Sequence, residues 1–457
     1  MSQARFATCL PLPMEQKVLV NIIEKAKDWA LMHGVGMRDK KHFNKDTIQI
    51  APFVLLPSPF PRAEFTKAVE LQPVLNELMH KVAHDDEFLE ETLQNALQVD
   101  EFTANLYNIW VKVRTEGISQ PINLGMLRSD IMLESRCPHT EKQCAKHTPY
   151  CSWKQVEINS IASGFGHLGP VSREIQSYIL RQLGHSDLIK NMPENRALSG
   201  LCSGIKTRPE IQIIRKTMNE IYEETELNDK KQLMIDGKPV AVVYYRSGYE
   251  PAQYPSCREW DARLRVERST AIKCPSIAYQ LAGTKKVQQA LAVPGVLEKF
   301  MGGGTATERV RDIFTGLYSL DFDESGERAV EMALEDAERF VLKPQREGGG
   351  NNLYGSDVRE ALLKMRHSRE RSAYILMERI LPPLVSGYVV RPGAAVPPPL
   401  TDLVSELGIF GVIIGTKDRI YCNKQVGHML RTKLADANEG GVAAGLGALD
   451  SPYLIDQ

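Results

Sequence analysis

The sequence predicts a mixed α/β fold in which helical and strand-like stretches alternate along 457 residues. Apolar residues recur at helical spacing over residues 14–34, and short apolar runs at 239–245 and 340–342 are typical of buried strands. Glycine-rich turns follow several of these runs, and open α/β sheets bind their ligands at strand ends. With 43% hydrophobic and 25% charged residues, the chain is long enough for two or three packed regions.

The composition argues against several classes of protein. A net charge of −1 is unlike the basic excess of a dedicated nucleic-acid surface. No window of about 18 uninterrupted apolar residues predicts a membrane span, and the start of the chain has no apolar core of signal-peptide length. We therefore expect a cytoplasmic protein whose 8 cysteines are reduced thiols rather than a disulfide framework.

The first quarter of the chain is predicted to be mainly helical. The apolar stripe at 14–34 ends at Gly34, a residue type that commonly stops helices. A short strand-like run follows at 51–57, and amphipathic helices cover 61–116. Their apolar positions are expected to form core.

A strand with a bend is predicted over residues 123–133, with Arg128 and Ser129 at the bend. The guanidinium group of Arg128 suits two-point binding of a carboxylate. A solvated surface arginine fits this stretch equally well.

The segment 137–151 holds three cysteines and two histidines, which are zinc ligand types. Their spacing matches none of the familiar zinc-finger patterns. We favour a variable surface loop over a zinc site.

The stretch 154–159 alternates as a strand does, and it places Glu157 and Asn159 on one face. Two oxygen donors two residues apart can coordinate one magnesium ion. An edge strand with polar residues facing water fits equally. The small residues at 160–164 would let a substrate lie against the backbone.

The middle of the chain is predicted as a helix at 171–183, a boundary at 191–207 and a charged helix or pair of helices at 209–233. A buried strand at 239–245 follows. Its carboxyl end, where α/β sheets place ligands, carries Arg246, Ser247, Gly248 and Tyr249.

Two further features lie between residues 280 and 305. Lys285 and Lys286 could pair with phosphate, or they could begin a solvated helix. The glycine triplet at 302–304 has neither a preceding strand nor a lysine, so we expect an ordinary loop there.

The most informative stretch is RFVLKPQREGGGNNLY, residues 339–354. Lys343 ends a short strand and offers a point charge for phosphate. The three glycines at 348–350 can turn their N–H groups toward phosphate oxygens, and Glu347 could hold the accompanying magnesium. A flexible surface loop is the alternative for the glycines alone. This is not a Walker loop, because no Gly-Lys-Ser/Thr follows the glycines.

The C-terminal part is predicted to begin with a charged helix at 356–371 and a strand at 373–380 whose backbone could contact adenine. A proline-rich connection at 382–399, an antiparallel pair at 405–414 and 419–423, and a glycine-rich tail at 428–448 follow. The tail holds Arg431 and Lys433. Its cluster GGVAAG at 440–445 suggests a mobile loop that closes on a ligand.

Together these residues could activate a carboxylate with ATP, and the sequence resembles the eukaryotic glutathione synthetases. The resemblance extends over nearly the whole chain. It is carried by KQVEIN (154–159), VVYYRSGY (242–249), QLAGTKKVQQ (280–289), FVLKPQREGGGNNLYG (340–355), YILMERI (374–380), SELGIFGV (405–412), VGHMLRTK (426–433) and GGVAAG (440–445).

The resemblance implies an ATP-grasp fold with a helical N-terminal part, a smaller parallel-sheet substrate domain and glycine-rich lid loops. It implies an N-terminal part of the body at 1–199, a substrate-binding domain at 200–300, and a lid with the C-terminal part of the body at 301–457. It also implies a cytosolic homodimer that ligates γ-glutamylcysteine to glycine with ATP and Mg²⁺, through an acyl phosphate.

The resemblance assigns roles to individual residues, with Lys343 and Arg431 as the catalytic groups. The implied metal ligands are Glu157, Asn159 and Glu347. The implied ATP contacts are Glu157, Lys285, Lys343, Pro344, Gln345, Arg346, Glu347, Gly348, Gly349, Gly350, Asn351, Asn352, Tyr354, Met377, Glu378, Arg379, Ile380, Glu406, Lys433 and Glu439. The implied substrate contacts are Arg128, Ile161, Ala162, Ser163, Gly164, Arg246, Ser247, Gly248, Tyr249, Arg431, Val442 and Ala443.

The chain departs from the family pattern in two places. Gly164 stands where the family usually carries serine. Near residues 205–208 the family carries a further strand and helix of about 30 residues, including a Glu-Arg-Asn triplet and a glutamine that contact the dipeptide. Losing that strand should expose the neighbouring strand at 239–245, so we expect weak or no dipeptide binding beside a complete set of ATP residues.

Two other functions remain open on the sequence. A splice form or incomplete gene model could be catalytically silent and still bind ATP or dimerise with a complete subunit. A related ligase could use another acceptor amine, such as β-alanine or serine. A dehydrogenase is disfavoured, because no strand leads into Gly-x-Gly-x-x-Gly.

Overall fold

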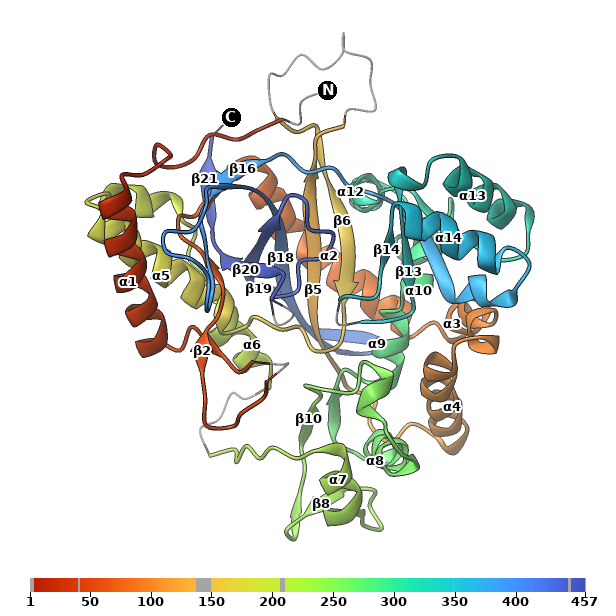
Figure 1. The fold of residues 1–457 in the computed structure, drawn as a ribbon. Coiled ribbons are helices and arrows are strands. Elements are labelled where there is room, and N and C mark those ends of the chain that lie inside the picture. The colour runs from red at the N-terminus through yellow and green to blue at the C-terminus, as the bar shows by residue number, and fades with distance from the viewer. Residues whose placement is uncertain are drawn as a thin grey trace.

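The computed structural model describes residues 4–456 apart from 40–41, 137–148, 206–209, 348 and 443–444. At the centre of the described residues is a sheet of eight strands, in the order β17-β3-β20-β19-β18-β5-β6 with β16 beside β18 (Figure 1). Neighbours run antiparallel except β20 and β3. The strands are β3 (Phe53–Val54), β5 (Asn123–Glu134), β6 (Ser152–Asn159), β16 (Val385–Gly387), β17 (Val389–Val390), β18 (Thr401–Thr416), β19 (Arg419–Leu434) and β20 (Gly447–Asp450).

Side-chain alternation gives this sheet a core face and a site face. On β5, Leu127 and Ile131 belong to the main hydrophobic core, so Arg128 and Asp130 point to the opposite face. The predicted bend at Arg128 and Ser129 is wrong. Both residues pair with β18 in unbroken register, because the polar side chains have a face of their own and need no turn.

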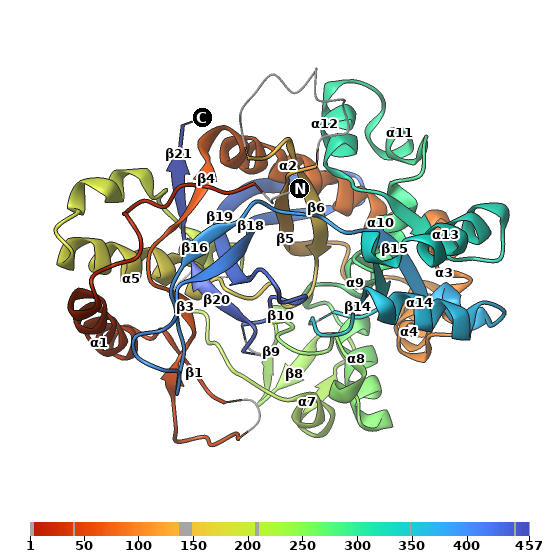
Figure 2. The same ribbon diagram turned by 45° about the horizontal axis from the view of Figure 1, so that its top comes forward.

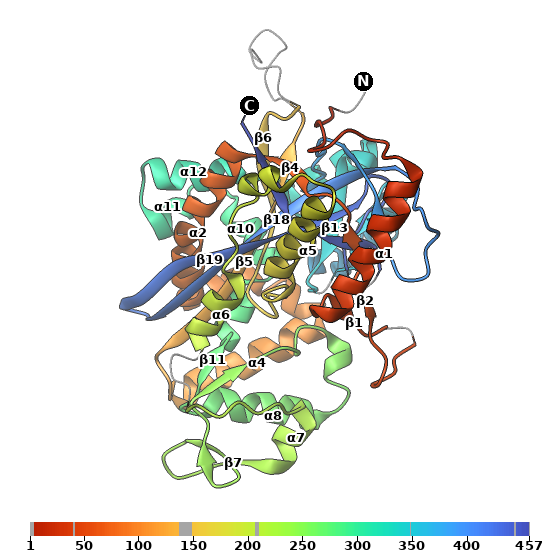
Figure 3. The same ribbon diagram turned by 90° about the vertical axis from the view of Figure 1, so that its left-hand side faces the viewer.

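Helices cover the sheet on both sides. α1 and α5 pack over the β3–β20 edge (Figures 2 and 3), α6 packs on β18 and β19, and a larger group surrounds the core face of β5 and β18. The predicted helices at 14–34, 61–116 and 171–183 are confirmed. These helices are α1 (Gln16–Met32), α2 (Arg62–Ala83), α3 (Asp86–Leu93), α4 (Glu101–Glu116), α5 (Leu168–Gln182), α6 (Ala197–Ile205), α9 (Ile277–Ala282), α10 (Lys285–Leu291), α11 (Val296–Met301) and α12 (Thr305–Ile313).

A four-stranded antiparallel sheet in the order β12-β15-β13-β14 packs against α13 and α14, and we call this unit the lid lobe (Figure 1). The strands predicted at 340–342 and 373–380 are confirmed as β13 and β15. The elements are β12 (Leu317–Ser319), α13 (Glu324–Glu335), β13 (Phe340–Pro344), β14 (Leu353–Tyr354), α14 (Ser356–Met365) and β15 (Tyr374–Glu378).

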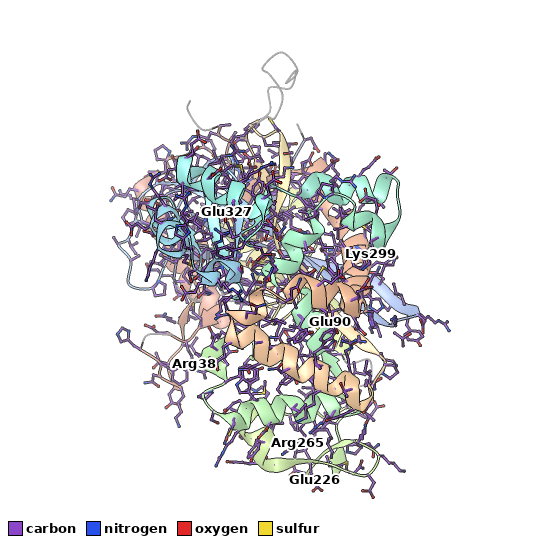
Figure 4. All side chains as sticks on the ribbon, turned by 90° about the vertical axis from the view of Figure 1, so that its right-hand side faces the viewer. Arg38, Glu90, Glu226, Arg265, Lys299 and Glu327 are labelled. Atoms are coloured by element: carbon purple, nitrogen blue, oxygen red, sulfur yellow. The ribbon has the colours of Figure 1, made fainter. Side chains whose placement is uncertain are left out.

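A second unit, which we call the small lobe, lies apart from the lid lobe. Figure 4 labels Glu327 on α13 at one end of the molecule and Arg265 and Glu226 of the small lobe at the other. Arg265 donates to the carbonyls of Ile221 and Tyr222 at the end of α7, at 3.2 and 2.8 Å. The small lobe contains α7 (Met218–Glu224), β7 (Thr225–Leu227), β8 (Leu233–Ile235), β9 (Lys238–Pro239), β10 (Val242–Tyr244), α8 (Cys257–Arg268) and β11 (Ile272–Cys274).

Two predictions for the small lobe need correction. The helices predicted over 209–233 reduce to the short α7, because the chain then turns into the β7–β8 hairpin. The strand predicted at 239–245 exists as β10 but is not buried. Among the described residues it pairs only with β11. Val242 and Val243 are half-buried and Tyr244 is 37% exposed, as expected if a neighbouring strand is missing.

Two short strand pairs complete the described structure, β1 (Gly36–Met37) with β2 (Gln49–Ile50) and β4 (Ser58–Pro61) with β21 (Pro452–Ile455). Within the described residues, no helix combines the length and apolar character that crossing a bilayer requires.

The described cysteines correct one sequence-based expectation. Five of them are free thiols: Cys9, Cys202, Cys257, Cys274 and Cys422. Cys151 is disulfide-bonded, so the expectation that all cysteines are reduced is wrong at that position. Most of the predicted zinc or surface loop, residues 137–148, lies outside the described residues.

Candidate active site

A cavity of about 210 Å³ opens between the central sheet and the lid lobe. Its walls come from β5, β6, β18 and β19 on one side and from β13, β14 and β15 on the other. Most residues predicted to contact ATP line it, together with Arg431: Glu157, Lys285, Lys343, Arg346, Glu347, Gly349, Asn351, Asn352, Tyr354, Met377, Glu378, Arg379, Ile380, Glu406, Lys433 and Glu439.

A bulge in β6 shapes the floor of this cavity. The β5–β6 register shifts between Asp130 and Ile131, and Val156 is the extra residue that the shift leaves unpaired. Val156 and Glu157 both line the cavity as a result. The Val156 carbonyl accepts a hydrogen bond from Lys343 Nζ at 2.9 Å, which connects the end of β13 to the central sheet.

Three charged groups meet beside this bulge. Lys285 Nζ lies 3.0 Å from Glu157 Oε2 and 2.7 Å from Glu347 Oε1. Burial alone would lower the pKa of Lys285, but the two carboxylates reverse that effect and raise it. Lys343 has no such direct partner, and its burial lowers the pKa of its ammonium group.

The pKa values of the two carboxylates beside Lys285 are shifted in opposite directions. Burial alone would raise the pKa of Glu157, but Lys285, Lys343 and Arg431 together lower it. Burial and the charge of Glu157 raise the pKa of Glu347, to about 7. The ammonium groups therefore hold Glu157 ionised, whereas Glu347 lacks enough positive charge to offset its burial.

A second ion pair closes the sheet side of the cavity. Arg431 on β19 and Glu406 on β18 are cross-strand partners, and Arg431 Nε donates to Glu406 Oε1 at 2.9 Å. Burial raises the pKa of Glu406. The carboxylate holds the arginine over the cavity floor, close to Glu157.

The residues present suit a magnesium ion. The carboxylates of Glu157 and Glu347 converge on one ammonium group, and carboxylate oxygens are ligands that Mg²⁺ prefers. Asn159 is buried and does not line the cavity; its side-chain N–H donates to Asp130 Oδ2 at 3.0 Å, so its side-chain carbonyl oxygen is the atom that would coordinate a metal. Among the described residues, no group of three His, Cys, Asp or Glu side chains is arranged for a metal. The predicted set contains only two such residues.

Some predicted ATP contacts lie off the cavity surface. The Gln345 side chain accepts from the Lys286 backbone N–H at 2.9 Å and donates to the Ala373 carbonyl at 3.3 Å. Pro344 is the last residue of β13 and does not line the cavity among the described residues. Lys286 faces away and bonds Asp321 at 2.6 Å, so neither phosphate binding nor a solvated helix start describes it.

The glycine-rich loop is held by a carboxylate. Glu439 accepts from the backbone N–H groups of Gly350 and Asn352 at 2.6 and 3.4 Å. Backbone N–H groups that face a carboxylate in this way can equally face a phosphate. Gly348, the first glycine of the triplet, lies outside the described residues.

The predicted substrate contacts on the central sheet are buried. Arg128 forms a two-point ion pair with Asp130, with Nε–Oδ1 at 2.6 Å and NH2–Oδ2 at 2.7 Å. Ile161 packs in the main core. Ser163 Oγ donates to the Met126 carbonyl at 2.8 Å, which fixes the loop after β6 to β5.

That loop stores backbone strain. Ala162 has φ 51° and Phe165 has φ 73°, a region that non-glycine residues rarely adopt. Gly164 lies between them, and a Cβ on it would come within 3.8 Å of Arg246 NH2. The strained loop therefore approaches the small lobe at the residue where the family usually carries serine.

The predicted substrate contacts on the small lobe and the tail are less well enclosed. Arg246 and Ser247 are exposed and Tyr249 is half-buried. Gly248, at φ 99°, is buried against Tyr254 and Met218. Of the remaining predicted contacts, Val442 is buried in the core under α1 and α5, and Ala443 lies outside the described residues.

The sequence analysis missed two carboxylates that contact predicted site residues. Asp130 bonds Arg128 and Asn159, and Asp100, at the N-cap of α4, pairs with Arg346. The two-residue spacing of Arg128 and Asp130 on one strand could have revealed the first. No local signal pointed to the second, because Asp100 precedes Arg346 by 246 residues.

Comparisons with known proteins agree over almost the full length. The family model for the eukaryotic glutathione synthase ATP-binding domain matches residues 16–454. The chain is 39% identical to the glutathione synthetases of Xenopus laevis and Homo sapiens, covering 96% and 97% of this chain and 98% of each relative. It is 36% identical to a chloroplastic glutathione synthetase of Arabidopsis thaliana, covering 97% of this chain and 86% of that protein.

A solved structure shows the same fold. It is that of a glutathione synthetase-like effector from Globodera pallida in its apo form, with a TM-score of 0.74 and 24% sequence identity. The match covers 98% of this chain and 100% of the other. At that identity the likeness concerns the fold, which is the mixed α/β, ATP-grasp type that the sequence predicts.

Proposed function

Because the chain belongs to the eukaryotic glutathione synthetase family, we propose that it joins γ-glutamylcysteine to glycine, using ATP and releasing ADP and phosphate. The chain covers 98% of the length of the Xenopus laevis and Homo sapiens glutathione synthetases. The proposed enzyme is an ATP-dependent carboxylate–amine ligase.

One observation supports this proposal most strongly. Glu157, Lys285, Lys343, Glu347 and Arg431 come from four separate parts of the chain and line one cavity. Three of them are in direct contact, with Lys285 2.7 Å from Glu347 and 3.0 Å from Glu157. Buried charges are costly unless they are paired or used, and a triphosphate with its metal would use both signs.

The proposed mechanism assigns each group a part. Lys343 and Arg431 offset the negative charge that develops as the γ-phosphoryl group moves from ATP to the cysteinyl carboxylate of the dipeptide. Glycine then attacks the acyl phosphate through its amine, a C–N bond forms, and the C–O bond to phosphate breaks. Glu157, Asn159 and Glu347 would hold Mg²⁺, which when bound supplies charge neutralisation to the phosphates.

The loops around the cavity have a separate task. Acyl phosphates react with water, so the site must be closed while the intermediate exists. Glu439 bonds the glycine-rich loop to the tail, through Gly350 at 2.6 Å. We propose that these two glycine-rich loops move together when they close on ATP, and that Met377–Ile380 contact its adenine.

The test is product formation. Purified protein with ATP, Mg²⁺, γ-glutamylcysteine and glycine should release ADP and form glutathione, measured by a coupled ADP assay and by chromatography. Replacing glycine with β-alanine or serine tests the acceptor. Product from either of those amines and not from glycine would assign a related ligase instead.

A specific observation favours a second candidate, a form that binds ATP but ligates poorly. The alignment with the Xenopus protein runs over 477 positions. Since 96% of 457 residues is about 439, roughly 38 of these positions have no residue in this chain. Among the described strands β10 has one partner, β11, and its Tyr244 is 37% exposed. Tight ATP binding without ADP release would establish this candidate.

Three finer assignments are also part of the proposal. We expect a homodimer, which light scattering after size-exclusion chromatography would test, and a cytosolic location, which fractionation would test; chloroplastic relatives exist. We also keep the division at 1–199, 200–300 and 301–457 as a proposal for the domains. Limited proteolysis that cuts near residues 200 and 300 would support it.

A further inference from the structure

The Asp130 carboxylate lies where three of the predicted site residues meet. Its Oδ1 accepts from Arg128 Nε at 2.6 Å, and its Oδ2 accepts from Arg128 NH2 at 2.7 Å and from Asn159 Nδ2 at 3.0 Å. Arg431 NH2 lies 3.7 Å from the same Oδ2. Asp130 itself is 0% exposed. Of these three partners Arg431 lines the cavity, so Asp130 could influence a substrate there through Arg431 rather than by direct contact.

The strands around Asp130 are shaped to admit this carboxylate. Its cross-strand partner on β18 is Gly408. A Cβ on Gly408 would lie 2.8 Å from Asp130 Oδ1 and 2.9 Å from Arg128 Cδ, closer than real Cβ contacts. On the other side, the register shift between Asp130 and Ile131 makes the bulge that brings Glu157 into the cavity.

Stability alone does not explain this arrangement. Two guanidinium groups and a carboxylate buried in a sheet are commonly no more stabilising than apolar residues of the same size. Met126 and Met132, which lie on the same face of β5 as Arg128 and Asp130, are buried in apolar clusters, so this face accepts apolar residues. A charged cluster behind a cavity wall instead fixes the orientation of a group that reaches into the cavity, which here is Arg431.

We propose that Asp130 is a positioning residue for the ligase reaction, which orients Arg128, Asn159 and Arg431 relative to one another. By occupying the Nε–NH2 edge of Arg128, it fixes the plane of that guanidinium group. The orientation of Arg128 in turn fixes the position of the dipeptide carboxylate relative to the bound nucleotide and its metal. This inference rests on the proposed function, because it takes Arg128 and Arg431 as substrate contacts.

The first test is Asp130→Asn, which keeps the size of the side chain and removes its charge. We expect the KM for γ-glutamylcysteine to rise about 10- to 100-fold, the range typical for groups that orient a binding residue. The KM for ATP should rise by a smaller factor, because Asp130 contacts Asn159 among the groups proposed to hold ATP and its metal, but not Lys285 or Lys343. Crystal structures should show the guanidinium groups of Arg128 and Arg431 displaced. Unchanged KM values with both arginines in place would overturn the proposal.

A matched control removes another buried carboxylate from the same sheet. Asp450 on β20 is also 0% exposed, but it bonds the neutral side chains of Ser58, Gln176 and Thr432. Asp450→Asn should lower stability while leaving the ratio of the two KM values and the Arg128 position unchanged. An equal change in that ratio in both variants would mean that any buried carboxylate has this effect, and would overturn the proposal.

A second variant covers the case in which Asp130→Asn fails to fold. Gly408→Ala adds one methyl group against Asp130 and Arg128 and changes no polar atom, so it should give the same selective rise in the dipeptide KM. Gly415→Ala is its control on the same strand, where a Cβ would contact Arg419 and His80 at 2.8 and 2.9 Å, away from the cavity. If the wild type forms no glutathione, the ligase function fails separately, and the arginine positions in these crystal structures still decide the role of Asp130.

Discussion

The phosphate end of the cavity and the small lobe hold their predicted site residues in different ways. At the phosphate end, Lys285 is 3% exposed and contacts two carboxylates, and Lys343 bonds a backbone carbonyl. In the small lobe, Arg246 and Ser247 are exposed at the end of a strand with a single described partner. The residues at the phosphate end are therefore held by contacts from several elements, whereas those of the small lobe are held by a single strand pair.

This difference indicates which half of the reaction the chain can support. Binding sites need side chains whose positions are fixed by their surroundings before the ligand arrives. The residues that we propose bind the nucleotide and metal meet that requirement, whereas the residues of the small lobe that we propose bind the dipeptide do not. We therefore expect ATP binding to be near that of a complete relative and dipeptide binding to be weak.

The largest effect is expected from removing Lys343, the lysine that we propose binds phosphate. Lys343→Met should reduce kcat about 10²- to 10³-fold, because one charge that stabilises the transferring phosphoryl group is lost. Steady-state ADP release at saturating substrates measures it. Lys154→Met is the control, since Lys154 bonds the carbonyls of Asp312 and Phe314 away from the cavity. A Lys343→Met enzyme with wild-type kcat would contradict the assigned role.

Restoring the missing segment should give the next largest effect. Inserting the strand and helix of a relative between residues 205 and 209 would supply about three polar contacts to the dipeptide, each contributing about 1 kcal/mol. The KM for γ-glutamylcysteine should then fall about 100-fold, with the KM for ATP unchanged. A glycine–serine insert of equal length is the control. Equal KM values for both inserts would show that the small lobe already binds the dipeptide fully.

The sequence predicted which residues come together at the phosphate end of the cavity better than it predicted the elements of the small lobe. Lys343 and Glu347 lie in one short stretch of sequence, so their proximity could be predicted from the order of residues. The shape of the small lobe depends on which strands are present to pair, and propensity alone predicted helix where β7 and β8 form.

The remaining misses have the same cause. The spacing of Arg128 and Asp130 could have suggested their ion pair, but the contacts of Asp130 with Asn159 on β6 and Arg431 on β19 join strands that are distant in the sequence. The bend predicted at Arg128 was wrong because two polar residues within a strand have the same local pattern as a turn. The bulge at Val156 depends on pairing between two strands, which the sequence of one strand does not specify.

A smaller effect should appear in hydrogen exchange. The amides of β10 (Val242–Tyr244) should exchange at least about 10-fold faster than those of β13 (Phe340–Pro344), because β13 has a partner strand on each side and β10 pairs with β11 alone among the described strands. Mass spectrometry of exchanged peptides compares the two directly. Adding ATP should widen the gap by protecting β13. Similar protection in both strands would show that the open edge is covered in solution.

The smallest effect concerns the two carboxylates beside Lys285, which should respond oppositely to neutralisation. Burial and the charge of Glu157 raise the pKa of Glu347 to about 7 in the folded protein. Its favourable contribution to the free energy of unfolding is therefore complete below the pKa of the unfolded chain and is lost as pH rises through 7. Glu347→Gln should therefore raise the melting temperature of the ATP-free protein by about 1–3 °C at pH 8.5, with less gain at pH 5.5. The pKa of Glu157 is lowered, so its contribution persists at both pH values and Glu157→Gln should lower the melting temperature at both. Scanning calorimetry of the two variants at each pH measures the contrast. A destabilised Glu347→Gln at pH 8.5 would mean that Lys285 is shared equally between the carboxylates, and that the phosphate end carries no excess negative charge ready for a metal ion.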